Sequence, residues 1–306
     1  MDVDQSFLPT PFPVKAAIFE SFSRQNMSES EIDITTSIKQ FVKTTYGFPF
    51  GIDFTYADSS LTLFNKMVLC CIQEGGTLCF PVGTNGSYVY SAKFLKAKIV
   101  NIPTKSEEGF KLTENALNQV LNNVKTPWVY ISGPTINPTG RVYDQKEIEN
   151  LLTTCAKFGA RVMIDTSFSG LEFDYEGWGG WNLEGVLSRL YLSSSSFSVC
   201  LLGELSSMML TGALKFGFLA LNQLPLIDLF HSFSGLSRPH STVKYAIKKL
   251  LGLREKKSEE MWGAVTRQIK DLRSRSRRLE EVTIKFLLTI YYFFWFDPDA
   301  RNVLFY

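Results

Sequence analysis

Residues 128–174 read WVYISGPTINPTGRVYDQKEIENLLTTCAKFGARVMIDTSFSGLEFD, and this stretch decides the fold. An apolar run leads into a turn rich in Pro, Gly and Asn, an amphipathic segment follows, and a second apolar run ends at Asp165. This order predicts a βαβ unit, in which a helix joins two parallel strands. Ligands of open parallel sheets bind beyond the carboxyl ends of strands, so we expect Asn137 and Asp165 to point toward one crevice. Taken singly, each has a plainer interpretation, Asn137 as part of an ordinary turn and Asp165 as a cap.

Apolar runs alternate with amphipathic segments along most of the chain, as in sheets covered by helices on both faces. The pattern predicts strands at residues 52–56, 77–81, 98–102, 127–132, 161–165, 197–202 and 214–221. Capping residues and terminal glycines predict helices at residues 29–46, 59–74, 114–124, 145–158 and 241–252. We therefore predict one large, three-layer α/β domain around a mostly parallel, seven-stranded sheet.

Composition excludes several classes of function. The chain has 306 residues, of which 45% are hydrophobic and 20% charged, so it can bury a sizeable core. Its 32 Lys and Arg nearly balance its 30 Asp and Glu, and the net charge of +2 produces no global field that favours nucleic acid. The 5 cysteines form no CxxC pair and there are 2 histidines, so we expect no metal site. Cysteines within apolar runs indicate reduced thiols in a reducing compartment.

The chain shows no targeting signal that we recognise. The first residues, MDVDQSFLPTPFPVK, are acidic and interrupted by proline, unlike a secretory signal or a transit peptide. The aromatic run FLLTIYYFFWF at 286–296 is shorter than the roughly 20 apolar residues that span a bilayer. A buried tail and an interfacial anchor are the two interpretations of this run. We expect a cytoplasmic protein that has no membrane partner.

The pattern changes to helices alone after residue 222. A long charged helix is predicted at 256–285, and residues 238–285 contain 14 Lys and Arg against 6 Asp and Glu. The sequence RSRSRR at 273–278 has the charge to hold phosphates, but such runs are more often solvated helix faces. We therefore expect no nucleic-acid partner. Binding of nucleic acid or an acidic protein by this basic segment is the third interpretation of the chain, which stays open.

The sequence NPTG at 137–140, followed by a helix and a strand ending in Asp165, resembles the class I/II aminotransferases of the aspartate aminotransferase fold. The resemblance extends over most of residues 10–285. It implies the large domain of a pyridoxal-phosphate-dependent transferase of fold type I. It also implies that Asn137 donates to the phenolic oxygen of the cofactor and that Asp165 pairs with the protonated ring nitrogen, which makes the ring an electron sink.

The resemblance also assigns the phosphate cup. The sequence TYADSSLTLF at 55–64 matches the turn before a helix whose N–H groups hold the phosphate, which makes Ala57, Ser59 and Ser60 candidates. A pair of serines at a helix N-cap is the alternative. Phe168 stands where the family often has a tyrosine whose hydroxyl reaches the phenolic oxygen of the cofactor. The Phe168 ring has no hydroxyl group to donate.

This sequence departs most from the family's motif at the position of the Schiff-base lysine. Active enzymes carry a motif like S-x-S-K, followed by a phosphate-binding arginine and a glycine. In GELSSMMLTGALKFGF at 203–218, Ser207 aligns with the lysine and Lys215 with the arginine, and Ser206, Ser207 and Lys215 join the candidate cofactor contacts. Serine forms no imine, so the covalent link is lost unless Lys215 substitutes. Lysine keeps the charge of arginine but not its bidentate fork, so we expect weaker phosphate binding.

Three longer runs, at residues 7–26, 46–81 and 201–221, resemble the C-terminal aminotransferase-like region of the plant methionine S-methyltransferases. Those enzymes make S-methylmethionine from methionine and S-adenosylmethionine, and their methyl-transfer chemistry lies in a separate Rossmann domain. The glycines here do not follow a strand and open a helix as that domain requires. S-adenosylmethionine is therefore not expected on this chain, and pyridoxal phosphate either binds non-covalently or is lost.

We expect residues 1–235 to form the large domain, with an N-terminal arm and helix at 1–27. Residues 236–306 are expected to form a helical linker and an incomplete small domain, whose aromatic tail is either a divergent end or a read-through intron. The leading interpretation is a homo-oligomeric binding, regulatory or assembly module without transaminase chemistry, which takes an amino acid or an S-methyl amino acid. The alternative is an active pyridoxal-phosphate-dependent aminotransferase or lyase.

Overall fold

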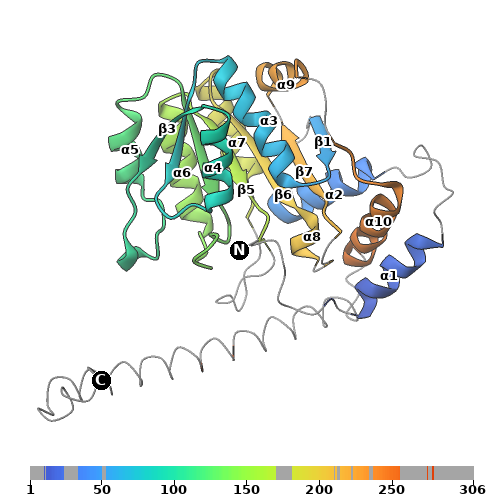
Figure 1. Ribbon diagram of the computed structural model, residues 1–306. Coiled ribbons are helices and arrows are strands. Elements are labelled where there is room, and N and C mark those ends of the chain that lie inside the picture. Colours follow the sequence, from blue (N-terminus) through green and yellow to red (C-terminus); the bar gives the residue numbers. More distant parts are fainter. Residues whose placement is uncertain are drawn as a thin grey trace, which may run out of the picture.

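The computed structural model describes residues 10, 12–23, 34–49, 53–169, 181–209, 211, 214–221, 223–233, 237–255, 274 and 278. A twisted sheet lies between two layers of helices (Figure 1). The strands are β1 Asp53–Ala57, β2 Thr77–Pro81, β3 Lys98–Ile102, β4 Pro127–Ser132, β5 Arg161–Asp165, β6 Ser198–Glu204 and β7 Gly217–Leu221. They form one 7-stranded sheet in the order β1-β7-β6-β5-β4-β2-β3. β7 runs antiparallel to β1 and β6, and the other pairs are parallel, which confirms the mostly parallel sheet.

The helices divide between the two faces of the sheet. They are α1 Phe12–Phe22, α2 Thr35–Tyr46, α3 Ser60–Gln73, α4 Gly86–Phe94, α5 Glu114–Leu121, α6 Gln145–Lys157, α7 Glu184–Ser193, α8 Leu205–Met208, α9 Leu224–His231 and α10 Ser241–Glu255. One apolar cluster joins α3, α4 and α9 to the sheet, and a larger one joins α1, α2, α5, α6, α7, α8 and α10 to it. The predicted three-layer α/β architecture is therefore confirmed.

Strand β4 shows why the sheet needs cover on both sides. All of its residues are buried, and its side chains alternate between the two clusters. Trp128 and Tyr130 pack on the α3 side, whereas Val129 and Ile131 pack on the α6 side. Successive side chains of a strand point to opposite faces of the sheet. Because the side chains of β4 are apolar on both faces, the strand is stable only between two layers of helices.

Local sequence signals set the ends of several helices. Asp144 and Glu147 form a reciprocal capping box at the start of α6, and Thr113 accepts the N–H of Ala116 at the start of α5. Ser59 is the N-cap of α3, where its Oγ accepts the N–H of Thr62 at 3.3 Å. Gly47, with φ of 55°, ends α2 in the left-handed conformation that glycine adopts without strain. Helices α3, α5 and α6 agree closely with the ranges that the sequence predicts. The predicted start of the helix at 29–46 is wrong, because α2 begins only at Thr35, after its N-cap Ile34.

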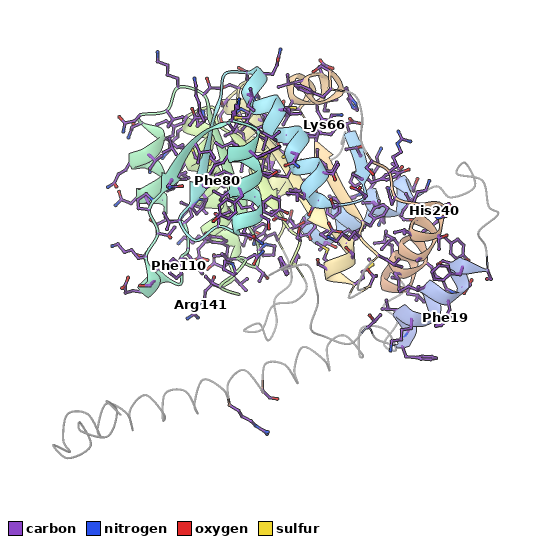
Figure 2. The ribbon with its side chains drawn as sticks, viewed as in Figure 1. Phe19, Lys66, Phe80, Phe110, Arg141 and His240 are labelled. Carbon is purple, nitrogen blue, oxygen red and sulfur yellow. The ribbon has the colours of Figure 1, made fainter. Side chains whose placement is uncertain are left out.

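Helix α3 is the central helix of its layer, and it contacts β1, β2, β6 and β7. Its buried Lys66 lies close to α9 (Figure 2). Lys66 Nζ is 4.1 Å from the centroid of the Phe230 ring of that helix. Burial lowers the pKa of this lysine. The aliphatic stem of Lys66 therefore contributes to the apolar layer, and its charge is held by an aromatic face.

The sequence-based boundaries are wrong at β6 and β7. Strand β6 extends past the predicted end at residue 202 to Glu204, because it pairs antiparallel with β7 up to Glu204 and Gly217. The predicted strand 214–221 begins only at Gly217. The Phe216 N–H donates instead to the Glu204 carboxylate at 2.8 Å, so Lys215 precedes the strand and does not belong to its alternating face.

Some predictions lie outside the described residues. These are residues 29–33 of the helix predicted at 29–46, the aromatic run at 286–296, and the helix at 256–285 apart from Ser274 and Arg278. Within the described part of the chain, no helix is long and apolar enough to cross a membrane. All 5 cysteines are buried free thiols, as the apolar runs around them predict.

Gly217 offers a test of how tightly β7 meets α3. A Cβ at this position would lie 2.3 Å from both the carbonyl carbon of Ser59 and the nitrogen of Ser60. Gly217→Ala should therefore lower the free energy of unfolding by about 1–3 kcal/mol, since backbone must move to admit the methyl group. Urea denaturation followed by circular dichroism measures the change.

Gly185→Ala is the matched control. Gly185 lies in the exposed first turn of α7, and a Cβ there meets no heavy atom within 4 Å. This substitution should leave stability unchanged or raise it by up to about 1 kcal/mol, because alanine favours the helix. Equal effects of the two substitutions would contradict the proposed contact between β7 and α3.

Candidate functional site

The ends of five neighbouring strands bring the polar groups of the crevice together. Ser132, at the end of β4, pairs in register with Asp165 at the end of β5. Glu204, at the end of β6, pairs with Gly217 at the start of β7, which in turn pairs with Ala57 at the end of β1. Because β7 runs antiparallel, its first residue lies at the carboxyl edge of the parallel strands. This edge is where open α/β sheets bind ligands.

Asp165 is buried at this edge with both carboxylate oxygens bound by the chain itself. Its Oδ2 accepts the Tyr130 hydroxyl at 2.6 Å. Its Oδ1 accepts the N–H of Ser167 at 3.0 Å and the Ser167 hydroxyl at 2.5 Å. Burial raises the pKa of Asp165, although these donors act in the opposite direction. The chain's own donors therefore hold the Asp165 carboxyl group in one orientation.

A row of hydroxyl groups leads from Asp165 to α3. The rings of Tyr130 and Tyr88 lie with their centroids 5.4 Å apart, and the Tyr88 hydroxyl shares a hydrogen bond of 3.2 Å with Ser60 Oγ. Burial, and then the charge of Asp165, raise the pKa of both tyrosines well above the usual value. Both hydroxyl groups are therefore neutral at physiological pH, and that of Tyr130 donates to Asp165.

Glu204 ends this row at the N-terminus of α3. Its Oε2 accepts the N–H of Ser60 at 2.7 Å, and its Oε1 accepts the N–H of Phe216 at 2.8 Å. The Ser206 hydroxyl donates to the same Oε1. Burial raises the pKa of Glu204, and the three donors oppose this shift. The carboxyl group joins α3, α8 and the segment before β7.

Sequence reasoning missed Glu204, although the chain contained a signal for it. When Ser207 is placed at the lysine of S-x-S-K, Glu204 falls on the first serine of that motif. Glu204 thus places a carboxylate where the motif has a serine. This is a departure from the motif, as is Ser207 where the motif has a lysine. Tyr88 and Tyr130 were missed too, because buried tyrosines are normal in a core and carry no motif.

The predicted phosphate cup lies at the N-terminus of α3, where Glu204 accepts a hydrogen bond from the Ser60 N–H. Ala57 is fully buried, and the Ser60 backbone donates to Glu204. The Ser59 hydroxyl caps α3 and shares a hydrogen bond of 3.0 Å with Thr62 Oγ1. The plainer interpretation of Ser59, a helix cap, is therefore realised.

Asn137 and Phe168 lie beside this network. The Asn137 N–H donates to Ser132 Oγ at 3.0 Å, which places the turn next to the strand partner of Asp165. Asn137 also lines a small cavity of about 10 Å³ together with Ser132, Phe110 and Tyr143. Phe168 is half-buried in the turn after Asp165.

Ser207 and Lys215, which the motif aligns with the family's lysine and arginine, are more exposed to solvent than Asp165 and Glu204. Ser207 is half-buried on α8, next to Ser206, which contacts Glu204. Lys215 is exposed and immediately precedes Phe216, whose N–H donates to Glu204. The structure thus brings Ala57, Ser60, Asp165 and Ser206 into one connected edge, with Ser207 and Lys215 at its border.

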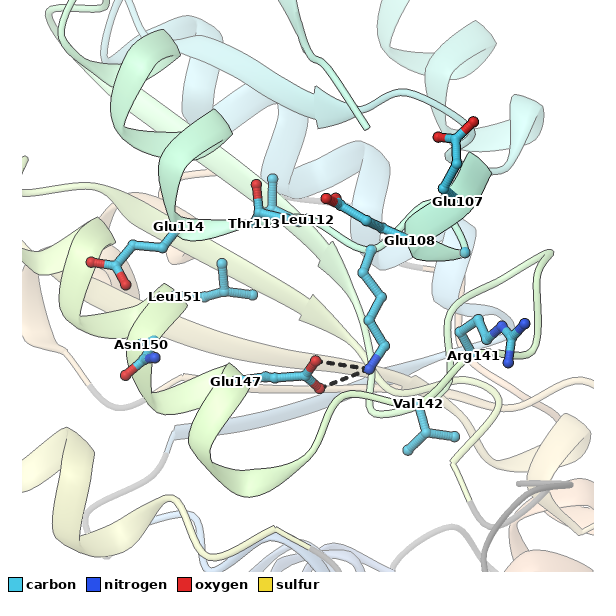
Figure 3. A pocket seen from close by; sticks show the side chains of 12 residues that line it. Glu107, Glu108, Leu112, Thr113, Glu114, Arg141, Val142, Glu147, Asn150 and Leu151 are labelled. Atoms are coloured by element: carbon cyan, nitrogen blue, oxygen red, sulfur yellow. Dashed lines mark hydrogen bonds and ion pairs between the residues drawn. The ribbon is translucent and has the colours of Figure 1, made fainter. Parts of the chain in front are cut away.

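A larger hollow lies away from this edge. It has a volume of about 690 Å³ and runs between the segment at residues 107–114 and α6 (Figure 3). Lys111 Nζ lies 2.8 Å from both carboxylate oxygens of Glu147 in this groove. The residues that line the groove include none of the predicted site residues, all of which the structure describes. Size alone therefore does not identify the site.

Comparison with known sequences identifies a family and several relatives. The pattern of the family "Aminotransferase class I and II" matches residues 59–301. The methionine S-methyltransferase of Arabidopsis thaliana is 61% identical over 284 residues, which are 92% of this chain and 26% of that protein. The protein of the same name from Wollastonia biflora is 56% identical over 284 residues, again 92% of this chain and 26% of that protein. The chain thus spans 26% of the length of these curated relatives.

Solved structures share the fold at low sequence identity. The aromatic aminotransferase of Pyrococcus horikoshii is 19% identical, with a TM-score of 0.72 over 94% of this chain and 74% of that one. A C-S lyase of Staphylococcus hominis with bound pyridoxal phosphate is 15% identical, with a TM-score of 0.68 over 88% of this chain and 66% of that one. These matches confirm the predicted fold type I of pyridoxal-phosphate-dependent transferases.

The residues of the crevice fit that cofactor only in part. The sequence motif assigns Asn137 and Asp165 to the cofactor. At the phosphate cup, however, the Ser60 N–H already donates to a buried carboxylate, and Ser207 supplies no amine. A phosphate and the Glu204 carboxylate require the same donor at the same helix end. In this arrangement the Ser60 N–H is already taken up by Glu204.

Tyr130→Phe tests the hydrogen bond that orients Asp165. The hydroxyl donates to the carboxylate and so favours its ionised form, which becomes populated as the pH rises through the raised pKa of Asp165. The substitution should lower the free energy of unfolding by about 1.5–3 kcal/mol at pH 8, and by less at pH 4. Urea denaturation at a series of pH values measures this difference.

Tyr143→Phe is the matched control. Tyr143 is also buried, but its hydroxyl accepts the N–H of Leu112 at 2.6 Å and does not bind a carboxylate. Its removal should cost about 1–3 kcal/mol equally at both pH values. A pH-independent loss for Tyr130→Phe would show that its hydroxyl does not stabilise the carboxylate.

Proposed function

The chain belongs to the class I and II aminotransferase family, and on this premise we propose that it is a non-catalytic binding, regulatory or assembly module of the methionine S-methyltransferase type. It keeps the fold and the aspartate of its family without the covalent chemistry. In this function the crevice holds a ligand, or stabilises an assembly, and forms no imine.

The single observation that carries the proposal is Ser207. A lysine amine forms the imine with the cofactor and moves the α-proton of the substrate, and a hydroxyl group does neither. Ser207 lies on α8, directly after β6, at the position that the motif assigns to the lysine. Lys215 precedes β7 and aligns with the phosphate-binding arginine, so it is offset from that position along the chain.

The relatives support a module within a larger activity. Proteins named methionine S-methyltransferase match this chain at 61% and 56% identity, and the match takes up 26% of their length. Methyl transfer from S-adenosylmethionine is therefore assigned in our proposal to other parts of such proteins. An amino acid or an S-methyl amino acid is the ligand class that we assign to the crevice, and we propose that the chain forms a homo-oligomer.

The absence of imine chemistry is testable by trapping. Purified chain is incubated with pyridoxal phosphate and reduced with borohydride, and the modified peptides are mapped by mass spectrometry. We expect adducts spread over exposed lysines in proportion to concentration, and no saturable modification of one lysine. Amino acids mixed with a keto acid acceptor should show no turnover.

Lys215→Ala and Lys157→Ala provide the controls. Lys157 is an exposed lysine at the end of α6, so its removal should change nothing beyond its own adduct. Stoichiometric labelling of Lys215, together with turnover that Lys215→Ala abolishes, would instead establish an active transaminase or lyase.

A further inference from the structure

We infer that Glu204 takes the place of a phosphate group: its carboxylate occupies the N-terminus of α3, and the crevice therefore admits no phosphate-bearing cofactor. This inference goes beyond the proposed function, which concerns the covalent imine. A phosphate bound without an imine would overturn the inference alone, and an imine formed by free pyridoxal would overturn the proposed function alone.

The first argument is the position of the carboxylate. The first N–H groups of a helix have no partner within the helix, and their partial positive charge makes this end an anion site. In α3, which runs Ser60–Gln73, the Ser60 N–H is the first of them. It lies 2.7 Å from Glu204 Oε2, a normal distance for a charge-assisted hydrogen bond. The Thr62 N–H donates to the Ser59 cap.

The second argument is that the carboxylate is held from several sides. Glu204 Oε1 accepts the Phe216 N–H at 2.8 Å and also the Ser206 hydroxyl. The residue is only 9% exposed, and its side chain bridges segments that are far apart in the sequence. Moving it aside would take from the Ser60 N–H the carboxylate that accepts it, and would leave the Phe216 N–H with only the longer hydrogen bond of 3.4 Å to Ser206 Oγ, which is costly.

The third argument is space. Gly217 lies directly against the α3 N-terminus, where even an added Cβ would be 2.3 Å from the Ser60 nitrogen. The Gly217 backbone on one side and Glu204 on the other take up the room around that N–H group. A phosphate dianion would also meet the carboxylate charge in a poorly solvated place, where like charges repel strongly.

The experiment compares wild type with Glu204→Ser, which restores the serine of the motif, and with Glu204→Gln, which keeps the size but removes the charge. Inorganic phosphate and pyridoxal phosphate are titrated by calorimetry, and phosphorus NMR reports the bound phosphate. We expect no saturable binding by wild type or Glu204→Gln. Glu204→Ser should bind both probes saturably, with an affinity at least tenfold above the weakest that the titration detects.

The matched control is Glu184→Ser, which makes the same change of charge on the exposed first turn of α7 and should behave like wild type. Three results would overturn the inference. These are phosphate binding to wild type that perturbs the Ser60 amide in NMR spectra, equal binding by Glu204→Gln and Glu204→Ser, and a folded Glu204→Ser that binds no phosphate.

A stability measurement covers the case in which Glu204→Ser is poorly folded. This variant removes the carboxylate that accepts the Ser60 and Phe216 N–H groups, so phosphate should raise its thermal midpoint. The same phosphate, compared with chloride at equal ionic strength, should not raise the midpoint of wild type or Glu184→Ser. Equal shifts in all three proteins would overturn the inference.

Discussion

The hydrogen bonds that Glu204 accepts from the Ser60 and Phe216 N–H groups are the constraint on which the rest of the crevice depends. They join the N-terminus of α3 to the end of β6 and to the segment that leads into β7. The Phe216 N–H is thereby withdrawn from the sheet, and β7 begins only at Gly217. The close approach of Gly217 to Ser60 follows from the same arrangement, because both backbones converge on one carboxylate.

The crevice contains two buried acids in different surroundings. Asp165 lies among hydroxyl groups of Tyr130 and Ser167, whereas Glu204 faces two backbone N–H groups and Ser206. Tyr88 and Ser60 connect the two regions. A family that binds an anionic cofactor normally presents donors at this edge. Here the chain supplies the anion itself, and the donors are satisfied within the protein.

Much of the fold was predictable because its signals are local. The strands 77–81, 98–102, 127–132 and 161–165 agree with the structure, since each is an apolar run bounded by turn residues or helix caps. The motif predicted correctly that Asp165 ends a strand, and this strand lies beside the one that precedes Asn137. The start of β7, and with it the place of Lys215, was not predictable, because the side chain of a distant glutamate competes there for a backbone donor.

The amino-acid sequence alone indicated the alternation of strands and helices and the family, and its motif spacing is what predicts Ser207 at the position of the family's lysine. Each of these is written in neighbouring residues or in a motif of set spacing. Only the tertiary structure decided that Glu204 meets Ser60, although 144 positions separate them along the chain. Hydrogen bonding requires atoms within about 3 Å, and it is the antiparallel entry of β7 beside β1 and β6 that brings these groups to one edge.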